Sequence, residues 1–358
     1  MTKRLISLAV ALALTSPLSA QEGPQAPPSP NEIVAQAAAE EWVAIAPEDL
    51  LVMTLSPGAD GSEREVVIQL MPAPFSQGWV ENIRTLARAE WYDDITVNRV
   101  QDNYVVQWGD PNYDNPEAEG EAKPLPEGLQ VVGIENYTAL FSDDMLKHSY
   151  NRWGGGSAVK PNAPVARNMN APEPTDYSDA YAGYVGFASG FPVAMDYVLD
   201  REWNIEGFSQ GAFVPDQVWP VHCYGMVGVG RGMSPDTGSG AELYTVIGHA
   251  PRHLDRNIAL VGRIVSGIEH LSSLPRGSGA LGFYTAEEAD KRTPILSVRV
   301  ASDLPAGERP AFEYLSTEGE TFARYAEARA NRRDPFFIVP AGGADICNIP
   351  VPVREAAK

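Results

Sequence analysis

The sequence predicts a mainly β protein, because short runs of β-branched and aromatic residues recur along it between polar or glycine-rich turns. The clearest pattern is a hairpin in which the runs 95–100 and 104–108 flank a polar Gln-Asp-Asn turn. An earlier hairpin is predicted from strands at 47–55 and 63–71, joined by the turn Pro-Gly-Ala-Asp-Gly. One arginine, Arg99, lies in the middle of the later hairpin.

Between the two hairpins the pattern changes to that of a helix. Val80, Ile83, Leu86 and Ala87 recur at the spacing that places side chains on one face of a 3.6-residue period. A helix with one apolar face packs that face against another element. We therefore expect this helix to cover part of the β structure.

The first residues have the pattern of a secretory signal peptide. Lys3 and Arg4 precede an apolar run at 5–14, and the segment ends with the small residues Ser19 and Ala20. The run is too short for a permanent membrane helix, which needs about 20 apolar residues. We expect cleavage after Ala20, a periplasmic or secreted protein, and no membrane insertion of the mature chain.

Charge and composition exclude several functions. A formal net charge of −20 repels phosphate backbones, so nucleic acid is not an expected partner. The five histidines show no H-E-x-x-H motif or clustered spacing, so we predict no metal site, and no cofactor. The two cysteines, Cys223 and Cys347, are consistent with one disulfide in an oxidising compartment, although the sequence leaves both the paired and the free state open.

Several stretches, taken in order, resemble one known family. They are Val-Glu-Asn-Ile at 80–83, Leu-Ala at 86–87, Asn-Arg-Val at 98–100 and Gln-Trp-Gly-Asp-Pro at 107–111. This order is similar to that of the cyclophilin-type peptidyl-prolyl cis-trans isomerases. The resemblance resumes at Trp219 and includes a glycine-rich loop, Glu-Leu-Tyr at 242–244, and Gly-Arg-Ile-Val followed by a second helix at 267–274.

The resemblance implies a closed eight-stranded antiparallel barrel capped by two helices, in which a strand at 294–300 closes the barrel against the first strand. The rest of the chain is a long insertion and a C-terminal extension with a helix at 318–332. We read the insertion as packed on the barrel; its length indicates either a functional insertion or partial disorder. The expected divisions are a signal peptide at 1–20, a leader with a short helix (31–42) at 21–46, barrel halves at 47–111 and 218–304, the insertion at 112–217 and the extension at 305–358.

The family resemblance implies an enzyme that isomerises X-Pro bonds, here in exported, proline-containing polypeptides. Arg99 matches the catalytic arginine. Arginine suits this role because it is permanently charged and has five N–H donors but no acceptor. The residues that match the substrate pocket are Tyr104, Val105, Gln107, Glu242, Tyr244, Leu254 and Val261.

The chain departs from the family pattern around this pocket. The changed positions are Val97 and Asn98 before the arginine, Val227 and Gly228 in place of an Ala-Asn pair, His253, Ile258 and Glu242. These changes leave open a second interpretation, a catalytically weak cyclophilin-like module that binds peptides or acts as a chaperone. If the carboxylate of Glu242 approaches Arg99, the two could form an ion pair. The oligomeric state is not indicated.

Three other short motifs carry no function in our interpretation. Asp-Thr-Gly-Ser at 236–239 resembles half of an aspartic protease site, but the required second copy is absent from the sequence. Gly-Phe-Ser-Gln-Gly at 207–211 fits a nucleophile elbow, but Pro215 follows where a helix is needed. The glycines at 228–232 lack the βαβ frame of a dinucleotide site.

Overall fold

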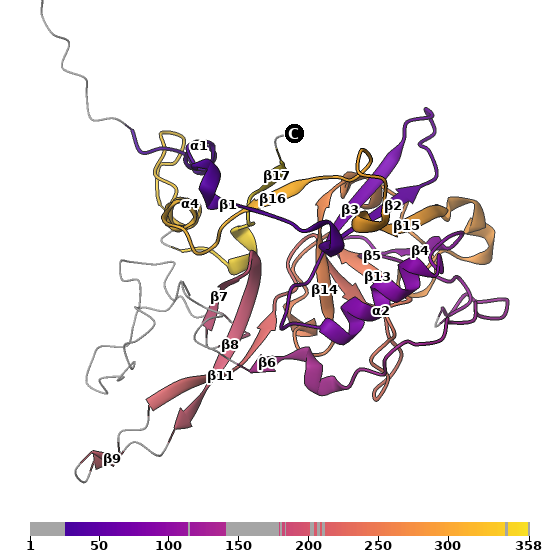
Figure 1. Cartoon of the computed structure of the whole chain (residues 1–358), viewed down its shortest axis with the longest axis horizontal. Coiled ribbons are helices and arrows are strands. Elements are labelled where there is room, and N and C mark those ends of the chain that lie inside the picture. Colours follow the sequence, from indigo (N-terminus) through magenta and orange to yellow (C-terminus); the bar gives the residue numbers. More distant parts are fainter. Residues whose placement is uncertain are drawn as a thin grey trace, which may run out of the picture.

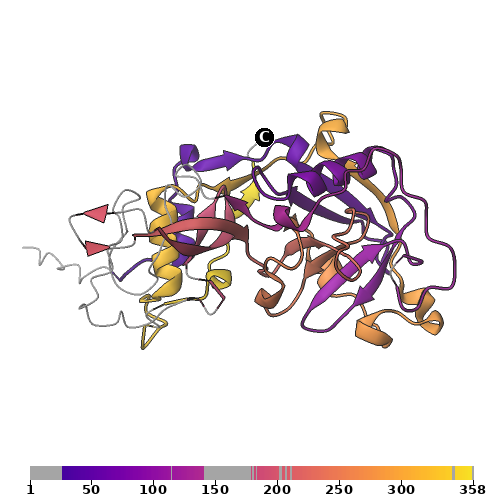
Figure 2. The same cartoon turned by 90° about the horizontal axis from the view of Figure 1, so that it is seen from below.

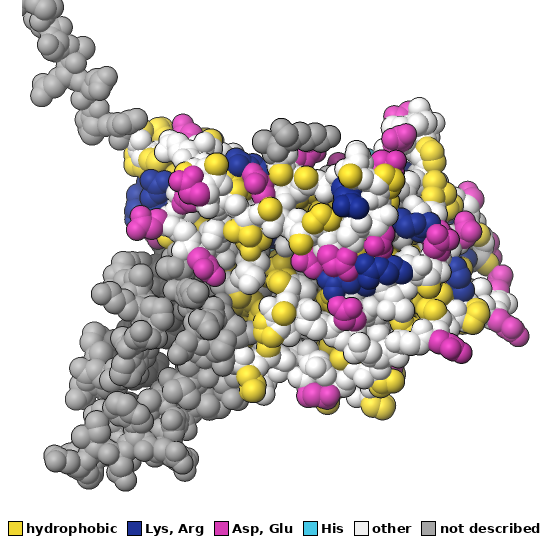
Figure 3. All heavy atoms as spheres, viewed as in Figure 1, with side chains coloured by type: hydrophobic (Ala, Val, Ile, Leu, Met, Phe, Trp, Pro, Cys, Tyr) yellow, Lys and Arg dark blue, Asp and Glu magenta, His cyan; other side chains and the backbone are white. Residues whose placement is uncertain are grey.

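The computed structural model describes residues 26–113, 115–140, 179, 181–182, 184–200, 204–205, 208–209, 212–340 and 343–356. The signal-peptide pattern at 1–20 lies outside them. Figures 1 and 2 show two groups of elements side by side: a barrel, and a smaller lobe of short sheets and helices. Acidic side chains are scattered over the face seen in Figure 3, with fewer basic ones among them.

The barrel is an eight-stranded sheet in the order β15-β2-β3-β14-β12-β13-β5-β4, and every neighbouring pair is antiparallel. Both predicted hairpins are confirmed, as β2–β3 and β4–β5. The strand expected to close the barrel, β15, pairs with the first, β2. The strands are β2 (Leu50–Leu55), β3 (Arg64–Leu70), β4 (Thr96–Val100), β5 (Val105–Gly109), β12 (Met226–Val229), β13 (Leu243–Val246), β14 (Leu260–Ser266) and β15 (Ile295–Val300).

The barrel is nearly closed rather than fully closed. Thr96 of β4 forms an antiparallel bridge with Pro294, just before β15, and the Val97 N–H donates to the Thr293 carbonyl at 2.9 Å. Further along β4 its free edge is covered by another segment, because Arg99 forms a bridge with Phe283. The loop after β14 thus completes the edge that β15 leaves open.

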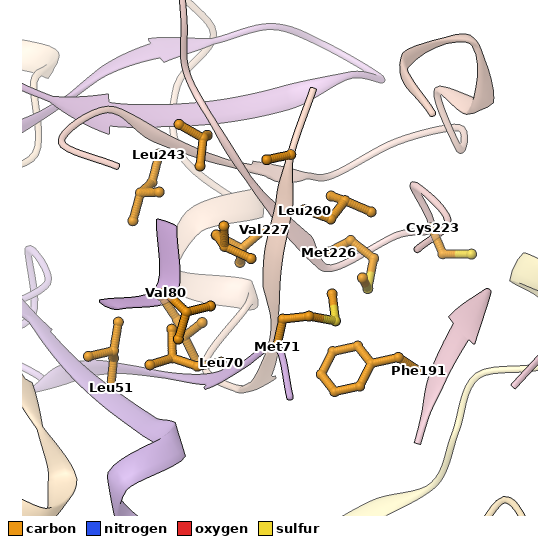
Figure 4. Close-up of a cluster of buried hydrophobic side chains, with 14 of the residues drawn as sticks. Leu51, Leu70, Met71, Val80, Phe191, Cys223, Met226, Val227, Leu243 and Leu260 are labelled. Atoms are coloured by element: carbon orange, nitrogen blue, oxygen red, sulfur yellow. The ribbon is translucent and has the colours of Figure 1, made fainter. Parts of the chain in front are cut away.

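Helix α2 (Gln77–Arg88) places its predicted face in the core. Its apolar residues Val80, Ile83, Leu86 and Ala87 are all buried, in one hydrophobic cluster with barrel residues. Figure 4 shows Val80 pointing toward Leu70 of β3. The helix contacts β14 and β15. The second helix expected at 267–274 is shorter, α3 (Glu269–Ser272).

A four-stranded sheet in the order β6-β11-β8-β7 shares this hydrophobic cluster. Phe191 of β8 is fully buried and lies beside Met71 and Met226 of the barrel (Figure 4). A separate pair, β9 (Asn204–Ile205) and β10 (Phe208–Ser209), is antiparallel. The sheet strands are β6 (Ala139–Leu140), β7 (Tyr184–Ala188), β8 (Phe191–Asp200) and β11 (Ala212–Pro220).

A third sheet joins the two ends of the described chain. It has the order β1-β16-β17, from β1 (Trp42–Ala44), β16 (Phe312–Leu315) and β17 (Val353–Glu355). Beside it, helices α1 (Pro30–Ala35) and α4 (Glu320–Ala330) contact each other. The helix expected at 31–42 is therefore wrong beyond Ala35, because Trp42 pairs with Leu315, a distant partner that local sequence does not reveal. The helix predicted at 318–332 is confirmed as α4, and its residues Phe322, Tyr325 and Ala326 are buried.

The two cysteines form a disulfide. Cys223 and Cys347 are bonded across a sequence separation of 124 residues. The bond attaches the C-terminal segment to the residues just before β12, and so resolves the alternative that the sequence left open. No helix in the described part of the chain is long and apolar enough to cross a membrane.

Reduction of this disulfide is expected to destabilise the fold. Cross-linking a loop of this length restricts the unfolded chain, and its loss costs roughly 2–4 kcal/mol of unfolding free energy. Denaturant unfolding with and without dithiothreitol measures the difference. A Cys223→Ser/Cys347→Ser variant should unfold at the midpoint of the reduced wild type, with or without dithiothreitol. Equal unfolding midpoints for oxidised and reduced wild type would contradict the prediction.

Candidate functional site

A pocket of about 520 Å³ opens on the outer face of the barrel. Its walls come from the β4–β5 hairpin, from β13, and from four loops. The hairpin and β13 supply Arg99, Tyr104, Val105, Gln107 and Tyr244, and the loops supply Asn112, Asn115, Pro116, Gly230, Arg231, Leu254, Ile258, Leu281 and Phe283.

Cross-strand register brings the central residues into one row. Arg99 of β4 lies opposite Gln107 of β5, Gln107 opposite Tyr244 of β13, and Tyr244 opposite Gly228 of β12. Residues opposite each other in antiparallel strands share a face. Strands from two distant parts of the sequence therefore meet in one line across the outside of the barrel.

A β-bulge puts Arg99 on this outer face. The pairing shifts between Val97 and Arg99, so that Asn98 is an extra residue in β4. Without the shift Arg99 would share the inward face of Val97, since side chains alternate with period two. Asn98 is buried and stabilises the bulge, because its Nδ2 donates to the Gly109 carbonyl at 3.0 Å. The departure from the family pattern at Asn98 thus has a structural role.

The guanidinium of Arg99 is held in place by three acceptors. Nε donates to the Leu281 carbonyl at 2.7 Å, Nη1 to Gln107 Oε1 at 3.2 Å, and Nη2 to Gln101 Oε1. The group lies over the rings of Tyr104 and Phe283, 5.6 and 5.5 Å from their centroids. Burial lowers the pKa of Arg99, but a guanidinium stays protonated at neutral pH.

Tyr244 forms the floor of the pocket and explains the glycine beside it. A Cβ atom at Gly228 would lie 2.4 Å from the Tyr244 Oη, closer than any real contact. The aromatic ring therefore occupies the space of a side chain at 228. The replacement of the Ala-Asn pair and the tyrosine at 244 therefore depend on each other, because the Tyr244 ring needs the space that a side chain at 228 would fill.

A buried chain of polar groups leads away from Tyr244. Its Oη is 2.8 Å from His222 Nε2, and His222 Nδ1 is 2.8 Å from Asp255 Oδ1. The other carboxylate oxygen of Asp255 accepts from Arg252 Nε at 2.7 Å, and Arg252 also makes two hydrogen bonds to Asp179. The pocket floor is thus connected to Asp179, which lies outside the barrel strands.

This chain of hydrogen-bonded groups fixes the tautomer of His222. A carboxylate only accepts hydrogen bonds, so Nδ1 carries the proton, Nε2 is the acceptor and the Tyr244 hydroxyl donates. His222 is fully buried, and burial lowers its pKa despite the neighbouring Asp255. The imidazole is neutral, and it orients the Tyr244 ring.

The structure brings most of the sequence-predicted site residues together. Arg99, Tyr104, Val105, Gln107, Tyr244 and Leu254 all line the pocket. Glu242 and Val261 do not. Val261 is buried in the barrel core. Glu242 is buried with its carboxylate against Gly109, where a Cβ atom would lie 2.0 Å from Oε1, while the Arg99 guanidinium donates to Leu281, Gln107 and Gln101.

Sequence reasoning did not place several residues that line the pocket. Asn112, Asn115 and Pro116 follow the matched hairpin directly, and Arg231 follows the Gly230 of the glycine-rich loop, so their proximity to the motifs was an available signal. Leu281 and Phe283 had no such signal. Within the described residues no group of three or more His, Cys, Asp or Glu side chains is arranged to hold a metal ion.

The buried His222 should make stability depend on pH. Because its pKa is lowered in the folded state, the unfolded chain binds the proton first. The unfolding free energy should therefore fall as pH drops below about 6.5, by up to about 1.4 kcal/mol per pH unit. Denaturant unfolding between about pH 7 and 5 measures this slope. His222→Gln should flatten it, whereas Val227→Ala, a buried change without a titrating group, should keep it; equal slopes in His222→Gln and wild type would refute the assignment.

Comparison with known proteins identifies the family. The family model of the cyclophilin type peptidyl-prolyl cis-trans isomerase/CLD matches residues 62–300, more than half of the chain. Among solved structures, the cyclophilin AquaCyp293 from Hirschia baltica is similar in fold, with 20% identity and a TM-score of 0.55 over 90% of this chain and 100% of that chain. A Cryptosporidium parvum cyclophilin type peptidyl-prolyl cis-trans isomerase, crystallised with the dipeptide Ala-Pro, matches at 9% identity and a TM-score of 0.33 over 70% of this chain and 97% of that one. A search of curated proteins found no significant match. The chain belongs to the cyclophilin-type peptidyl-prolyl cis-trans isomerase family.

Proposed function

We propose that this enzyme isomerises X-Pro bonds of exported polypeptides, and that Arg99 stabilises the twisted prolyl amide. The observation that carries the proposal is the fixed guanidinium of Arg99 beside an apolar floor. Of its five N–H donors, three are used by Leu281, Gln107 and Gln101, so two remain for a substrate.

The chemistry needs no nucleophile. Rotation about an X-Pro bond has a barrier of about 20 kcal/mol, because the amide loses its resonance as it twists. The prolyl nitrogen gains a lone pair in the twisted form only. A donor aimed at that nitrogen binds the transition state better than either planar state, which is the condition for a faster reaction. A rate increase of about 10⁵ corresponds to about 7 kcal/mol.

The arrangement of the pocket supports this mechanism in two ways. Arg99 is pre-oriented by its acceptors and by the rings of Tyr104 and Phe283, so little reorganisation is needed when the amide twists. The aromatic and aliphatic side chains around it offer a proline ring a mainly apolar surface. In this proposal that surface comprises Tyr104, Val105, Tyr244, Leu254, Ile258 and Phe283.

Replacement of Arg99 should remove most of the activity. We expect Arg99→Ala to lower kcat/KM by about 10²-fold or more, the usual effect of losing one preorganised donor. Arg99→Lys should recover only part, because an ammonium lacks the planar fork of donors. A protease-coupled assay on an Ala-Pro peptide measures both, with Arg309→Ala as a surface control of equal charge loss.

The same assay decides between the enzyme and the binding module. Wild-type protein that binds the peptide but does not accelerate isomerisation would favour the peptide-binding or chaperone alternative. Normal activity in Arg99→Ala would remove the arginine from the mechanism.

The proposed location rests on the N-terminal pattern and on the disulfide. Residues 1–20 combine a basic start, an apolar run and a small-residue end. The Cys223–Cys347 bond is typical of an oxidising compartment such as the periplasm. We also propose the domain division given above, with two capping helices, an insertion at 112–217 and an extension at 305–358. The matched range 62–300 and the separate sheets of the smaller lobe support it.

Export predicts a processed chain. The mature protein should begin at Gln21 and be recovered outside the cytoplasm when expressed in a Gram-negative host. N-terminal sequencing of the fractionated protein tests this. A variant lacking residues 1–20 should stay in the cytoplasm; an extracytoplasmic protein that still begins at Met1 would contradict cleavage.

A further inference from the structure

The charge of the pocket is opposite to that of the chain. The chain carries a formal net charge of −20, but the only charged residues among those that line the pocket in the described structure are Arg99 and Arg231. Fields of exposed charges separated by more than a Debye length, about 8 Å at physiological ionic strength, are largely screened. A ligand inside the pocket therefore meets mainly the two nearby cations.

Arg231 has no acidic partner. Its Nε and Nη2 donate to the Asn257 carbonyl at 3.1 and 2.9 Å, and its Nη1 donates to the Gly232 carbonyl at 2.7 Å. These acceptors are neutral. No carboxylate of the described residues lies within ion-pair distance of Arg231 or of Arg99. The hydrogen bonds fix the position of the Arg231 guanidinium without neutralising its charge.

The nearest acidic residues in sequence are engaged elsewhere. Asp236 accepts the backbone N–H groups of Gly232 and Gly238 at 2.7 and 3.0 Å. Asp102, in the hairpin turn, forms an ion pair with Arg276 at 3.1 Å. Glu117, next to Pro116 of the rim, lies against the backbone at 279, where a Cβ atom would be 2.9 Å from its Oε1. Asp236 is thus held by backbone donors and Asp102 by Arg276, and neither forms an ion pair with Arg231 or Arg99.

The two cations border the same floor. Both act electrostatically on the hydroxyl of Tyr244. Tyr244 is on β13, which lies between β5 and β12 in the sheet. Arg99 is two strands away from Tyr244 along that row, and Arg231 follows β12 on the opposite side. A peptide that places its proline beside Arg99 and crosses the floor would bring a flanking side chain near Arg231.

We propose that Arg231 determines specificity, and that the pocket prefers X-Pro segments with an Asp or Glu close to the proline. This inference rests on the proposed isomerase function and narrows its substrate class to acidic proline-containing peptides. Arginine is suited to the role because its planar fork matches a carboxylate. Charge complementarity of this kind gives specificity more than raw affinity.

The test compares matched peptides. Each reference peptide contains Ala-Pro and has a Gln at one of the two positions on either side of this dipeptide. Its partner peptide has Glu in place of that Gln. For wild type we expect at least one Glu peptide to exceed its Gln partner about fivefold in kcat/KM, an effect of the size of a single exposed ion pair. The ratio should shrink when the salt concentration is raised from about 0.05 to 0.5 M.

Variants assign the preference to Arg231. Arg231→Gln should bring the Glu/Gln ratio close to one, and Arg231→Lys should retain most of it. Arg309→Gln removes the same charge at an exposed position outside the pocket and should keep the wild-type ratio. A wild-type ratio of one at all positions, or an unchanged ratio in Arg231→Gln, would overturn the proposal.

The dissociation constants of the same peptides are measured in parallel. They give the Glu/Gln ratio even if wild type does not accelerate isomerisation. Absent turnover with a Glu preference in binding would therefore refute the proposed isomerase function and support the specificity of Arg231. Turnover without any Glu preference would support the proposed isomerase function and refute the specificity of Arg231.

Discussion

The register of four barrel strands is the constraint on which the site depends. It aligns Arg99, Gln107, Tyr244 and Gly228 across β4, β5, β13 and β12. A slip by one residue would turn every side chain of a strand to the other face. The bulge at Asn98 is therefore as important to the site as the arginine, because it decides that Arg99 faces the pocket and Val97 the core.

The incomplete closure of the barrel has a consequence for the arginine. Strand β15 pairs with only one end of β4, and the loop that contains Phe283 covers the rest of that edge. The same loop supplies the Leu281 carbonyl and the Phe283 ring that hold the guanidinium. The loop that covers the open edge of β4 thus also fixes the position of the Arg99 side chain.

The floor of the pocket is connected to the smaller lobe. Tyr244, His222, Asp255 and Arg252 form a buried polar chain that reaches Asp179. Every member of such a network must be satisfied, because unpaired polar groups in the interior are costly. The neighbouring Cys223 is bonded to the C-terminal segment, so the residues before β12 are fixed from two directions. Asp179 and the C-terminal segment with Cys347, both outside the barrel strands, therefore belong to the environment of the site.

Local patterns alone predicted much of the fold. The hairpins β2–β3 and β4–β5 follow from strand periodicity and turn residues, and the buried face of α2 follows from helical spacing. The family resemblance predicted eight site residues, and six of them line the pocket. Glu242 was expected in the pocket wall from the family resemblance, but it precedes β13 and its carboxylate lies against Gly109.

The sequence by itself determined the elements whose signals are local: the alternating strands, the amphipathic helices and the arginine in its motif. The tertiary structure decided what depends on distant partners: that Trp42 begins a strand, that the cysteines pair, and that Leu281 and Phe283 hold Arg99. The physical reason is that periodicity records which face of an element is buried. It does not record which remote segment covers that face, and the pocket is built from such contacts.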